Sequence, residues 1–353
     1  MRSLLQPLQQ RGLALRNRIA VSPMCQYSSI DGMPDDCHLV HLGSRAVGGA
    51  AVVFTEASAV SPEGRISPQD AGIWNDAQAE AWARIAAFID AQGVVPAMQL
   101  AHAGRKASTF APWRGSGEVP RAEGGWQTVA PSALVFDESY PLPLALDEDG
   151  IAKVVADYRA AALRAHDAGF RIVEIHAAHG YLLHEFLSPL SNRRTDGYGG
   201  DFGARTRLLR ETIVAVRDAW PESLPLWLRI SATDWVDGGW DVEQSIELAR
   251  VAGGLGVDLV DVSSGGLDPR QEIATGPGYQ VPFAARIRRE AGVATGAVGL
   301  ITEPAQAEAI VAGGAADVVL LAREFLRDPY FPVRAVRELG GEPSPPPQYL
   351  RAW

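Results

Sequence analysis

Short apolar runs alternate with amphipathic segments along nearly the whole chain. The runs are rich in β-branched residues, and most are followed by a segment in which apolar residues recur at helical spacing. The segment 76–91 is an example, with Trp82, Ile85, Ala86 and Ile89 on one helical face. The pattern predicts eight strands, at 18–23, 50–56, 94–100, 171–176, 225–230, 257–262, 293–298 and 316–322.

Strands that are apolar along almost their whole length are typical of parallel strands buried on both faces. Right-handed crossovers close eight such strand–helix units most simply into a (β/α)8 TIM barrel. A doubly wound open sheet is disfavoured, because no Gly-x-Gly-x-x-Gly motif follows the first strand. The sequence therefore predicts an α/β fold with a single barrel domain over residues 1–353.

The alternation stops between about residues 102 and 148. This stretch holds five prolines and several glycines, too many for a regular element. A long insertion inside a compact domain is usually a lid or a binding loop. Because it follows the third strand, we expect a lid-like insertion at the carboxyl ends of the strands.

Composition and charge narrow the class of protein further. A formal charge of −10 and a pI near 5.2 argue against nucleic-acid or anionic-membrane partners. The chain has no apolar window of about 18 residues and no signal-peptide core near its start, so we expect a cytoplasmic protein. The two cysteines, Cys25 and Cys37, point to a reducing compartment and exclude an iron–sulfur cluster on ligand count.

The stretch with the richest chemistry is 174–186, which follows the fourth predicted strand. His176 and His179 can turn two N–H groups toward one carbonyl oxygen, and Tyr181 can donate a proton beside them. Together with His184 the histidines are also three candidate metal ligands, but the His-Glu-x-x-His pattern is missing and Gly180 breaks the spacing, so no metal is expected. Buried histidines without a chemical role are the other alternative.

Polar residues and glycines gather at the other strand ends, which form the active-site face of a TIM barrel. Gln99 can read the donor and acceptor edge of a flat heterocycle, and Arg229 can balance negative charge on it. Those are the two requirements of a flavin. The alternative for Arg229 is a structural ion pair with Asp261 or Asp234.

The last two strands predict a phosphate site. Gly299 follows strand seven, while Ala322 and Arg323 follow strand eight, and they offer close backbone approach with one fixed positive charge. Ser264 and Gly265 at the end of strand six can form the remaining wall of this cup-shaped phosphate site. Such a cup is common to many barrel enzymes and does not define an activity.

With these residues in place, the chain resembles the old yellow enzyme family of flavin-dependent ene-reductases, in particular its thermophilic-like bacterial branch close to the xenobiotic reductases. The likeness covers nearly the whole chain. It is carried by 22–27 (SPMCQY), 99–106 (QLAHAGRK) and 176–200 (HAAHGYLLHEFLSPLSNRRTDGYGG). The resemblance implies a barrel with non-covalent FMN at its mouth. NADPH would reduce the flavin, which would pass hydride to the C=C bond of an α,β-unsaturated carbonyl or nitro compound.

The resemblance also implies roles for single residues. His176 and His179 would hold the substrate oxygen, Tyr181 would protonate the α-carbon, and Tyr27 would face the substrate. Cys25, counted with the catalytic residues, would lie beside the flavin and tune its potential, although an ordinary buried cysteine is the alternative. The FMN would be lined by Ser22, Pro23, Met24, Cys25, Ala57, Gln99, Arg229, Ser264, Gly265, Gly299, Ala322 and Arg323.

The tail at 340–353 resembles this branch too, which implies a homodimer or homotetramer in which Arg351 and Trp353 complete a neighbour's substrate site. Two positions depart from the family: Ala322 stands where glycine is common, and Val298 where some xenobiotic reductases carry tryptophan. A dienoyl-CoA reductase is a rival reading, but the chain lacks its cluster cysteines and its further dinucleotide domain. A flavin- or phosphate-binding barrel without redox turnover is another.

Overall fold

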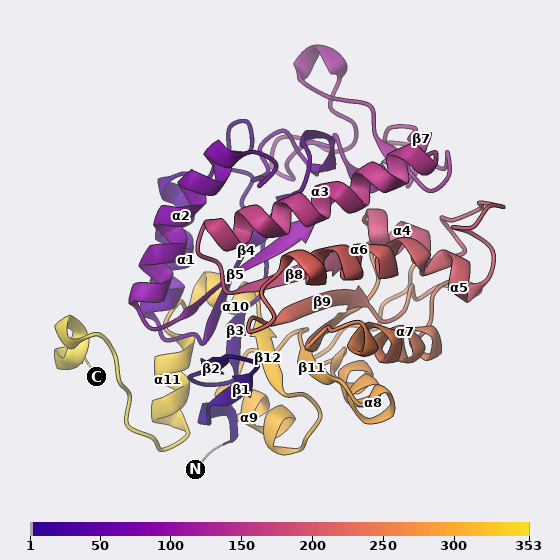
Figure 1. Ribbon diagram of the computed structural model, residues 1–353. Helices are drawn as coiled ribbons and strands as arrows, with labels where there is room; N and C mark the ends of the chain where they lie inside the picture. The colour runs from indigo at the N-terminus through magenta and orange to yellow at the C-terminus, as the bar shows by residue number, and fades with distance from the viewer. Residues whose placement is uncertain (1–2, 353) are drawn as a thin grey trace.

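A computed structural model describes residues 3–352, and it confirms the TIM barrel (Figure 1). Eight strands pair in parallel, in the order of the chain, and close into a barrel. The barrel strands are β3 (Ile19–Val21), β4 (Val52–Ala59), β5 (Val95–Ala101), β8 (Ile172–Ala177), β9 (Leu226–Ser231), β10 (Leu259–Ser263), β11 (Ala294–Ala297) and β12 (Val318–Leu321).

Helices surround the barrel and begin at side-chain caps. Asp35 and Asn75 each accept backbone N–H bonds in a capping box, which explains why α1 and α2 start where they do. Between β8 and β9, two helices, α5 and α6, follow each other with only Thr206 between them. The α-helices are α1 (Asp36–Val47), α2 (Asp76–Ala91), α3 (Glu148–Asp167), α4 (Leu182–Leu187), α5 (Phe202–Arg205), α6 (Arg207–Ala219), α7 (Val242–Gly254), α8 (Val281–Ala291), α9 (Pro304–Ala312), α10 (Arg323–Arg327) and α11 (Phe331–Glu338).

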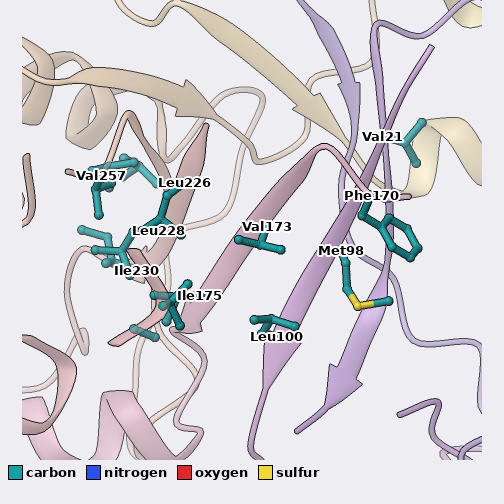
Figure 2. Close-up of a cluster of buried hydrophobic side chains, with 14 of the residues drawn as sticks. Val21, Met98, Leu100, Phe170, Val173, Ile175, Leu226, Leu228, Ile230 and Val257 are labelled. Carbon is teal, nitrogen blue, oxygen red and sulfur yellow. The ribbon is translucent and has the colours of Figure 1, made fainter. Parts of the chain in front are cut away.

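Successive side chains of each barrel strand point alternately toward the helices and into the barrel. The larger apolar cluster lies between the strands and the helices, and Figure 2 shows part of it, including Val173, Ile175 and Leu228. The alternate positions form a second, smaller cluster inside the barrel, to which Ile172 and Trp227 belong. Both faces of the strands are therefore buried, as the sequence predicts.

The interior of the barrel changes character toward the carboxyl ends of the strands. Two positions beyond the inward-facing Ala97, Ile172, Trp227 and Leu259, the same strands place polar side chains inside. We call this set the polar floor; it consists of Gln99, Glu174, Arg229 and Asp261, all of them buried. Buried polar groups are costly unless they are paired, so this layer is a candidate binding surface at the barrel mouth.

A hairpin that the sequence did not predict closes the other end of the barrel. Its strands are β1 (Leu8–Gln10) and β2 (Leu13–Leu15), and Leu13 and Leu15 join the interior cluster. The side-chain oxygen of Gln10 accepts a hydrogen bond of 2.8 Å from the Trp227 indole. The interior apolar cluster therefore lies between the polar floor and this hairpin.

The insertion at 102–148 is mostly irregular and lies over α3 at the top of Figure 1. It contains two 3-10 turns and the two-residue strands β6 (Val129–Ala130) and β7 (Leu144–Ala145), which pair with each other. Arg105 donates to the carbonyls of Leu134 and Val135 within the insertion, and to the carbonyl of Leu267 outside it. The 3-10 helices of the chain are η1 (Ser3–Leu5), η2 (Pro62–Gly64), η3 (Gly104–Lys106), η4 (Arg121–Glu123) and η5 (Pro347–Ala352).

The carboxyl-terminal tail leaves the barrel on the side away from the insertion, at the lower left of Figure 1. Residues 344–348 share a cavity of about 360 Å³ with Arg16 and Gln92. Arg16 precedes β3 and Gln92 follows α2, so the tail lies near the amino-terminal ends of the strands. Over residues 3–352, no helix combines the length and apolar character needed to cross a membrane.

Candidate functional site

The predicted site residues of the central strands meet at one end of the barrel. Gln99 on β5 is in register with Glu174 on β8, and His176 on β8 is in register with Arg229 on β9. All of these side chains point into the barrel near the carboxyl ends of the strands. The structure therefore brings the two halves of the predicted site, imidazoles and polar floor, to the same mouth.

Hydrogen bonds indicate which ring nitrogen of each histidine carries its hydrogen. The N–H of Ala178 donates to Nδ1 of His176 at 3.3 Å, so the hydrogen of this ring is on Nε2. That Nε2 lies 3.3 Å from Nδ1 of His179, whose own Nε2 lies 2.7 Å from Oγ of Ser263. Burial, reinforced by the charge of Arg229, holds the pKa of both imidazoles well below the ordinary value. Both rings are thus neutral donors.

The backbone of His179 is held in a left-handed conformation with φ of 60°. Its N–H donates to Oγ of Ser231 at 2.9 Å, and its C=O accepts from Nζ of Lys106 at 2.8 Å. Gly266 packs so close that a Cβ there would lie 2.6 Å from Cα of His179. These contacts stabilise a strained position, which is common where geometry serves function.

Tyr181 stands next to the histidines. Its ring centroid is 5.1 Å from that of His176, with the two planes at 88°. Burial raises the pKa of the Tyr181 phenol well above its ordinary value, so the hydroxyl stays protonated unless a strong base accepts its proton. Nζ of Lys106 lies 5.3 Å from the Tyr181 ring, and burial lowers the pKa of this amine to about 8. Sequence reasoning gave Lys106 no role, although it is one of only two lysines in the chain.

The polar floor contains both of the residues predicted to grip a flavin. Arg229 donates through Nη1 to Oγ of Ser22 at 3.1 Å, and its Nε lies 3.2 Å from Oδ2 of Asp261. Nε2 of Gln99 donates to Oε1 of Glu174 at 2.7 Å. The ion pair with Asp261, the alternative for Arg229, therefore exists, and it lies within the site itself.

The residues predicted to hold phosphate line a hollow of about 210 Å³ at the carboxyl ends of β11 and β12. Gly299, Ala322 and Arg323 contribute to its wall, as does Gln280, which the sequence did not reveal. Gly299 has φ of 120°, and a Cβ there would lie 2.8 Å from Nε2 of Gln280. Oγ of Ser264 donates to Oε1 of Gln280 at 2.6 Å, which links strand six to the same hollow.

The loop after β3 carries the remaining residues of the first motif. Pro23 and Met24 are half-buried, and the pKa of the Cys25 thiol is raised well above its usual range by burial and then by the charges of Asp70 and Glu56. A thiol that stays protonated is a poor nucleophile. Tyr27 lies next to Cys25 and packs edge-on against Trp113, with 5.5 Å between the ring centroids.

Two further predicted residues lie on or directly after the barrel strands. Ala57 on β4 is in register with Gln99. Gly265 follows β10, and its carbonyl accepts from Oγ of Ser231 at 2.8 Å. Between residues 3 and 352, no three or more His, Cys, Asp or Glu side chains are grouped so that they could hold a metal ion.

The tail residues do not join this site within one chain. Arg351 lies exposed on η5, and Trp353 lies outside the described residues. The nearest described aromatic of the tail, Tyr349, contacts Tyr330 at 6.1 Å between ring centroids.

The cup as a whole suits a flavin mononucleotide. One end is a glycine-lined hollow with an arginine, as a phosphate requires, and the other is a floor that offers an amide and a guanidinium to a heterocycle. The fold and the site thus define a flavin-dependent oxidoreductase built on a TIM barrel.

Comparison with known proteins gives the family. The profile of the NADH:flavin oxidoreductase / NADH oxidase family matches residues 3–342, and the chain belongs to this family. An NADPH dehydrogenase of Listeria innocua is 48% identical over 97% of either chain. The resemblance to the old yellow enzyme family is thereby confirmed, and FMN is the cofactor.

Solved structures agree with this assignment. Morphinone reductase has a TM-score of 0.80 and 30% identity, and the match covers 98% of this chain and 92% of that enzyme. A 2-naphthoyl-CoA reductase has a TM-score of 0.86 at 24% identity, a level that shows the shared fold alone. This chain spans only 52% of that larger reductase.

Proposed function

We propose that this chain is an NADPH-dependent ene-reductase that acts on α,β-unsaturated carbonyl or nitro compounds. The proposal is carried by one observation: two neutral imidazoles, with Nε2 of His176 and Nδ1 of His179 only 3.3 Å apart, converge beside Tyr181 above the polar floor. FMN, when bound, supplies the hydride chemistry between NADPH and the β-carbon of the alkene.

The histidines bind and polarise the substrate oxygen. A carbonyl or nitro oxygen that enters between the two rings replaces the hydrogen bond that they make with each other. His179 then carries its hydrogen on Nδ1, and the hydroxyl of Ser263 donates to the freed Nε2. Two donors fixed by the fold stabilise negative charge on that oxygen by a few kcal/mol each. Tyr181 gives its proton to the α-carbon, in keeping with its buried, protonated phenol.

We propose that FMN is held by the residues that the sequence singles out. Gly299, Ala322 and Arg323 would bind the phosphate, whereas Gln99 and Arg229 would hold the polar edge of the ring. The remaining wall would come from Ser22, Pro23, Met24, Cys25, Ala57, Ser264 and Gly265.

The loops would shape the substrate side of the pocket. Cys25 would tune the flavin as a neutral thiol, and Tyr27 would face the substrate. We propose that the insertion at 102–148 is the lid. This is supported by the ring of Phe136, which lies 4.6 Å from Nζ of Lys106, next to Tyr181.

We propose a cytoplasmic homodimer or homotetramer in which the tail, through Arg351 and Trp353, completes the site of a neighbouring subunit. Free cysteines and exposed apolar side chains support this picture, the latter including Ile30 at 79% exposure and Leu350 at 59%. Removal of the last six residues should alter both assembly and the kinetics with alkenes. Unchanged values for both would contradict the proposal.

Anaerobic titration tests the activity. Purified protein should be yellow, should be bleached by NADPH under argon, and should regain its colour with enones, maleimides or nitroalkenes. Bleaching without reoxidation by any of them would rule out the substrate class, and a bound flavin that NADPH cannot reduce would leave a flavin-binding protein.

The roles of the substrate-side residues are tested by half-reactions. Tyr181→Phe should slow alkene reduction and leave flavin reduction by NADPH intact, because only the first step needs the phenolic proton. Equal loss in both steps would speak against a dedicated proton donor. Joint replacement of His176 and His179 by alanine should weaken the binding of phenol, which resembles the enolate, and unaltered phenol affinity would contradict their role.

A further inference from the structure

Glu174 is a buried carboxyl in the polar floor that the proposed mechanism does not yet use. It has no exposed surface, and its Oε1 accepts the hydrogen bond of 2.7 Å from Nε2 of Gln99. Among the described residues, its Oε2 has no hydrogen-bond partner. A carboxyl in such surroundings is unstable as a bare anion, so its presence asks for an explanation.

The first consequence concerns the direction of the Gln99 amide. A side-chain amide has a donor end and an acceptor end. The donor end of Gln99 is turned to Glu174, so the carbonyl end points elsewhere in the floor. Without Glu174 the amide could rotate by half a turn and exchange the two ends, which would change what it offers to a heterocycle.

The second consequence concerns charge. The groups that face Glu174 are Gln99 from β5, Arg229 from β9 and Asp261 from β10, and His176 lies two residues further along β8. If both carboxyls were ionised, one guanidinium would be left to balance two negative charges. Burial, and then the charge of Asp261, raises the pKa of Glu174 to about 8.

The helix α4, which packs against the end of β8, adds two more titratable groups with partners of their own. Glu185 accepts the N–H of Arg105 at 2.9 Å, and His184 lies 2.9 Å from Asp234 through Nε2. Neither contacts Gln99 or Arg229, so the charge of the floor depends on Glu174 and Asp261.

We propose that Glu174 is a positioning residue for the flavin, which fixes the direction of the Gln99 amide and keeps the floor neutral by holding a proton. The inference rests on the proposed function, since it requires that the flavin lies on this floor. A floor without net charge does not repel the negative charge that the flavin gains when it accepts two electrons from NADPH, and so it keeps the reduction potential up.

Linkage between proton and electron binding makes this measurable. Negative charge on the reduced flavin raises the affinity of Glu174 for its proton. Above about pH 8 the carboxyl is ionised in the oxidised protein, and reduction then binds one additional proton from water, which forms an O–H bond on Glu174. Over that range the midpoint potential should fall more steeply with pH than it does below.

The experiment compares the midpoint potential of the FMN-loaded protein with that of Glu174→Gln across the pH range, by equilibration with a reference dye. Glu185→Gln is the matched control, because burial likewise raises the pKa of Glu185 to about 8 and this side chain does not contact Gln99. The steeper segment should be present in the wild type and in Glu185→Gln, and absent from Glu174→Gln. The same curve for Glu174→Gln and the wild type would overturn the proposal.

Two further measurements keep the test decisive. Asp261→Asn removes the negative charge that raises the pKa of Glu174. The pH at which the midpoint potential begins to fall more steeply should therefore move to a lower value, and an unchanged pH contradicts the proposal. Glu174→Leu leaves the Gln99 donor unpaired, so the FMN dissociation constant should rise roughly tenfold by flavin fluorescence, and an unchanged constant refutes the orienting role. A wild-type protein that takes up no FMN would instead refute the proposed function.

Discussion

Asp234 offers the sharpest test of how the fold holds the turn that carries His179 and Tyr181. This buried carboxylate accepts from Oγ of Ser188 at 2.6 Å and from the N–H of Trp240 at 2.7 Å. Its other oxygen lies 2.9 Å from Nε2 of His184, and Nδ1 of His184 accepts the N–H of Gly180 at 3.0 Å. Gly180 is the residue between the paired histidines and Tyr181, so Asp234 holds that turn through one imidazole.

The size of the effect follows from the partners that Asp234→Ala would leave behind. Two buried donors, those of Ser188 and Trp240, would lose their acceptor, His184 would lose the carboxylate beside it, and each unpaired buried donor costs about 1–3 kcal/mol. Removing one member of a buried charged network costs about 3–5 kcal/mol in all. At about 2 °C per kcal/mol for a chain of this size, the melting temperature should fall by roughly 6–10 °C.

The assay is thermal unfolding of the FMN-saturated protein followed by circular dichroism, with Asp268→Ala as the matched control. Asp268 pairs at 2.7 Å with Arg270, whose side chain is 68% exposed, and such pairs contribute about 1 kcal/mol or less. Asp234→Ala should also slow alkene reduction more than flavin reduction, because the turn that carries Tyr181 loosens. If the two variants melt within about 2 °C of each other, the network does not stabilise the fold as argued.

Three other changes separate the cofactor half of the site from the substrate half. Gly299→Ala places a Cβ 2.8 Å from Nε2 of Gln280 at a φ of 120°. The resulting strain of about 1–3 kcal/mol should weaken FMN binding, measured by flavin fluorescence, roughly tenfold or more. An unchanged dissociation constant would show that the hollow holds no phosphate. Arg229→Met leaves Asp261 buried without its cation, so FMN content after purification should drop and the melting temperature should fall, and full occupancy would contradict the assigned role. Lys106→Met removes the donor to the His179 carbonyl, so phenol should bind roughly tenfold more weakly at an unchanged FMN constant, whereas equal losses of both ligands would point to general unfolding.

The sequence predicts the barrel well because its signal is local. Each strand needs apolar residues on both faces, and a run such as 225–230 shows that without reference to any partner. The hairpin at β1 and β2 escaped prediction because three-residue strands have too few positions to show a period.

The site residues at the strand ends were predictable only where they lie close together in the sequence. His176, His179 and Tyr181 lie within six residues, so their meeting follows from one strand and one turn. The bond between Gln99 and Glu174 joins residues 75 positions apart, and it depends on the register of β5 against β8. Gln280 reaches its hollow from the start of α8, and no pattern in the sequence marks that position.

The way the site is divided between strands and loops follows from the closed barrel. Inward positions recur every second residue, so β5, β8, β9 and β10 all change from apolar to polar at a similar height, and a flat cofactor can lie on the layer that results. The strands cannot shift without breaking the ladder, so this half is rigid. His179, Tyr181 and the insertion lie outside the strand ladder and are held by side-chain contacts such as the hydrogen bonds of Lys106. Substitutions in the loops should therefore change which alkene is reduced, while substitutions in the polar floor should change whether FMN is bound and how readily it is reduced.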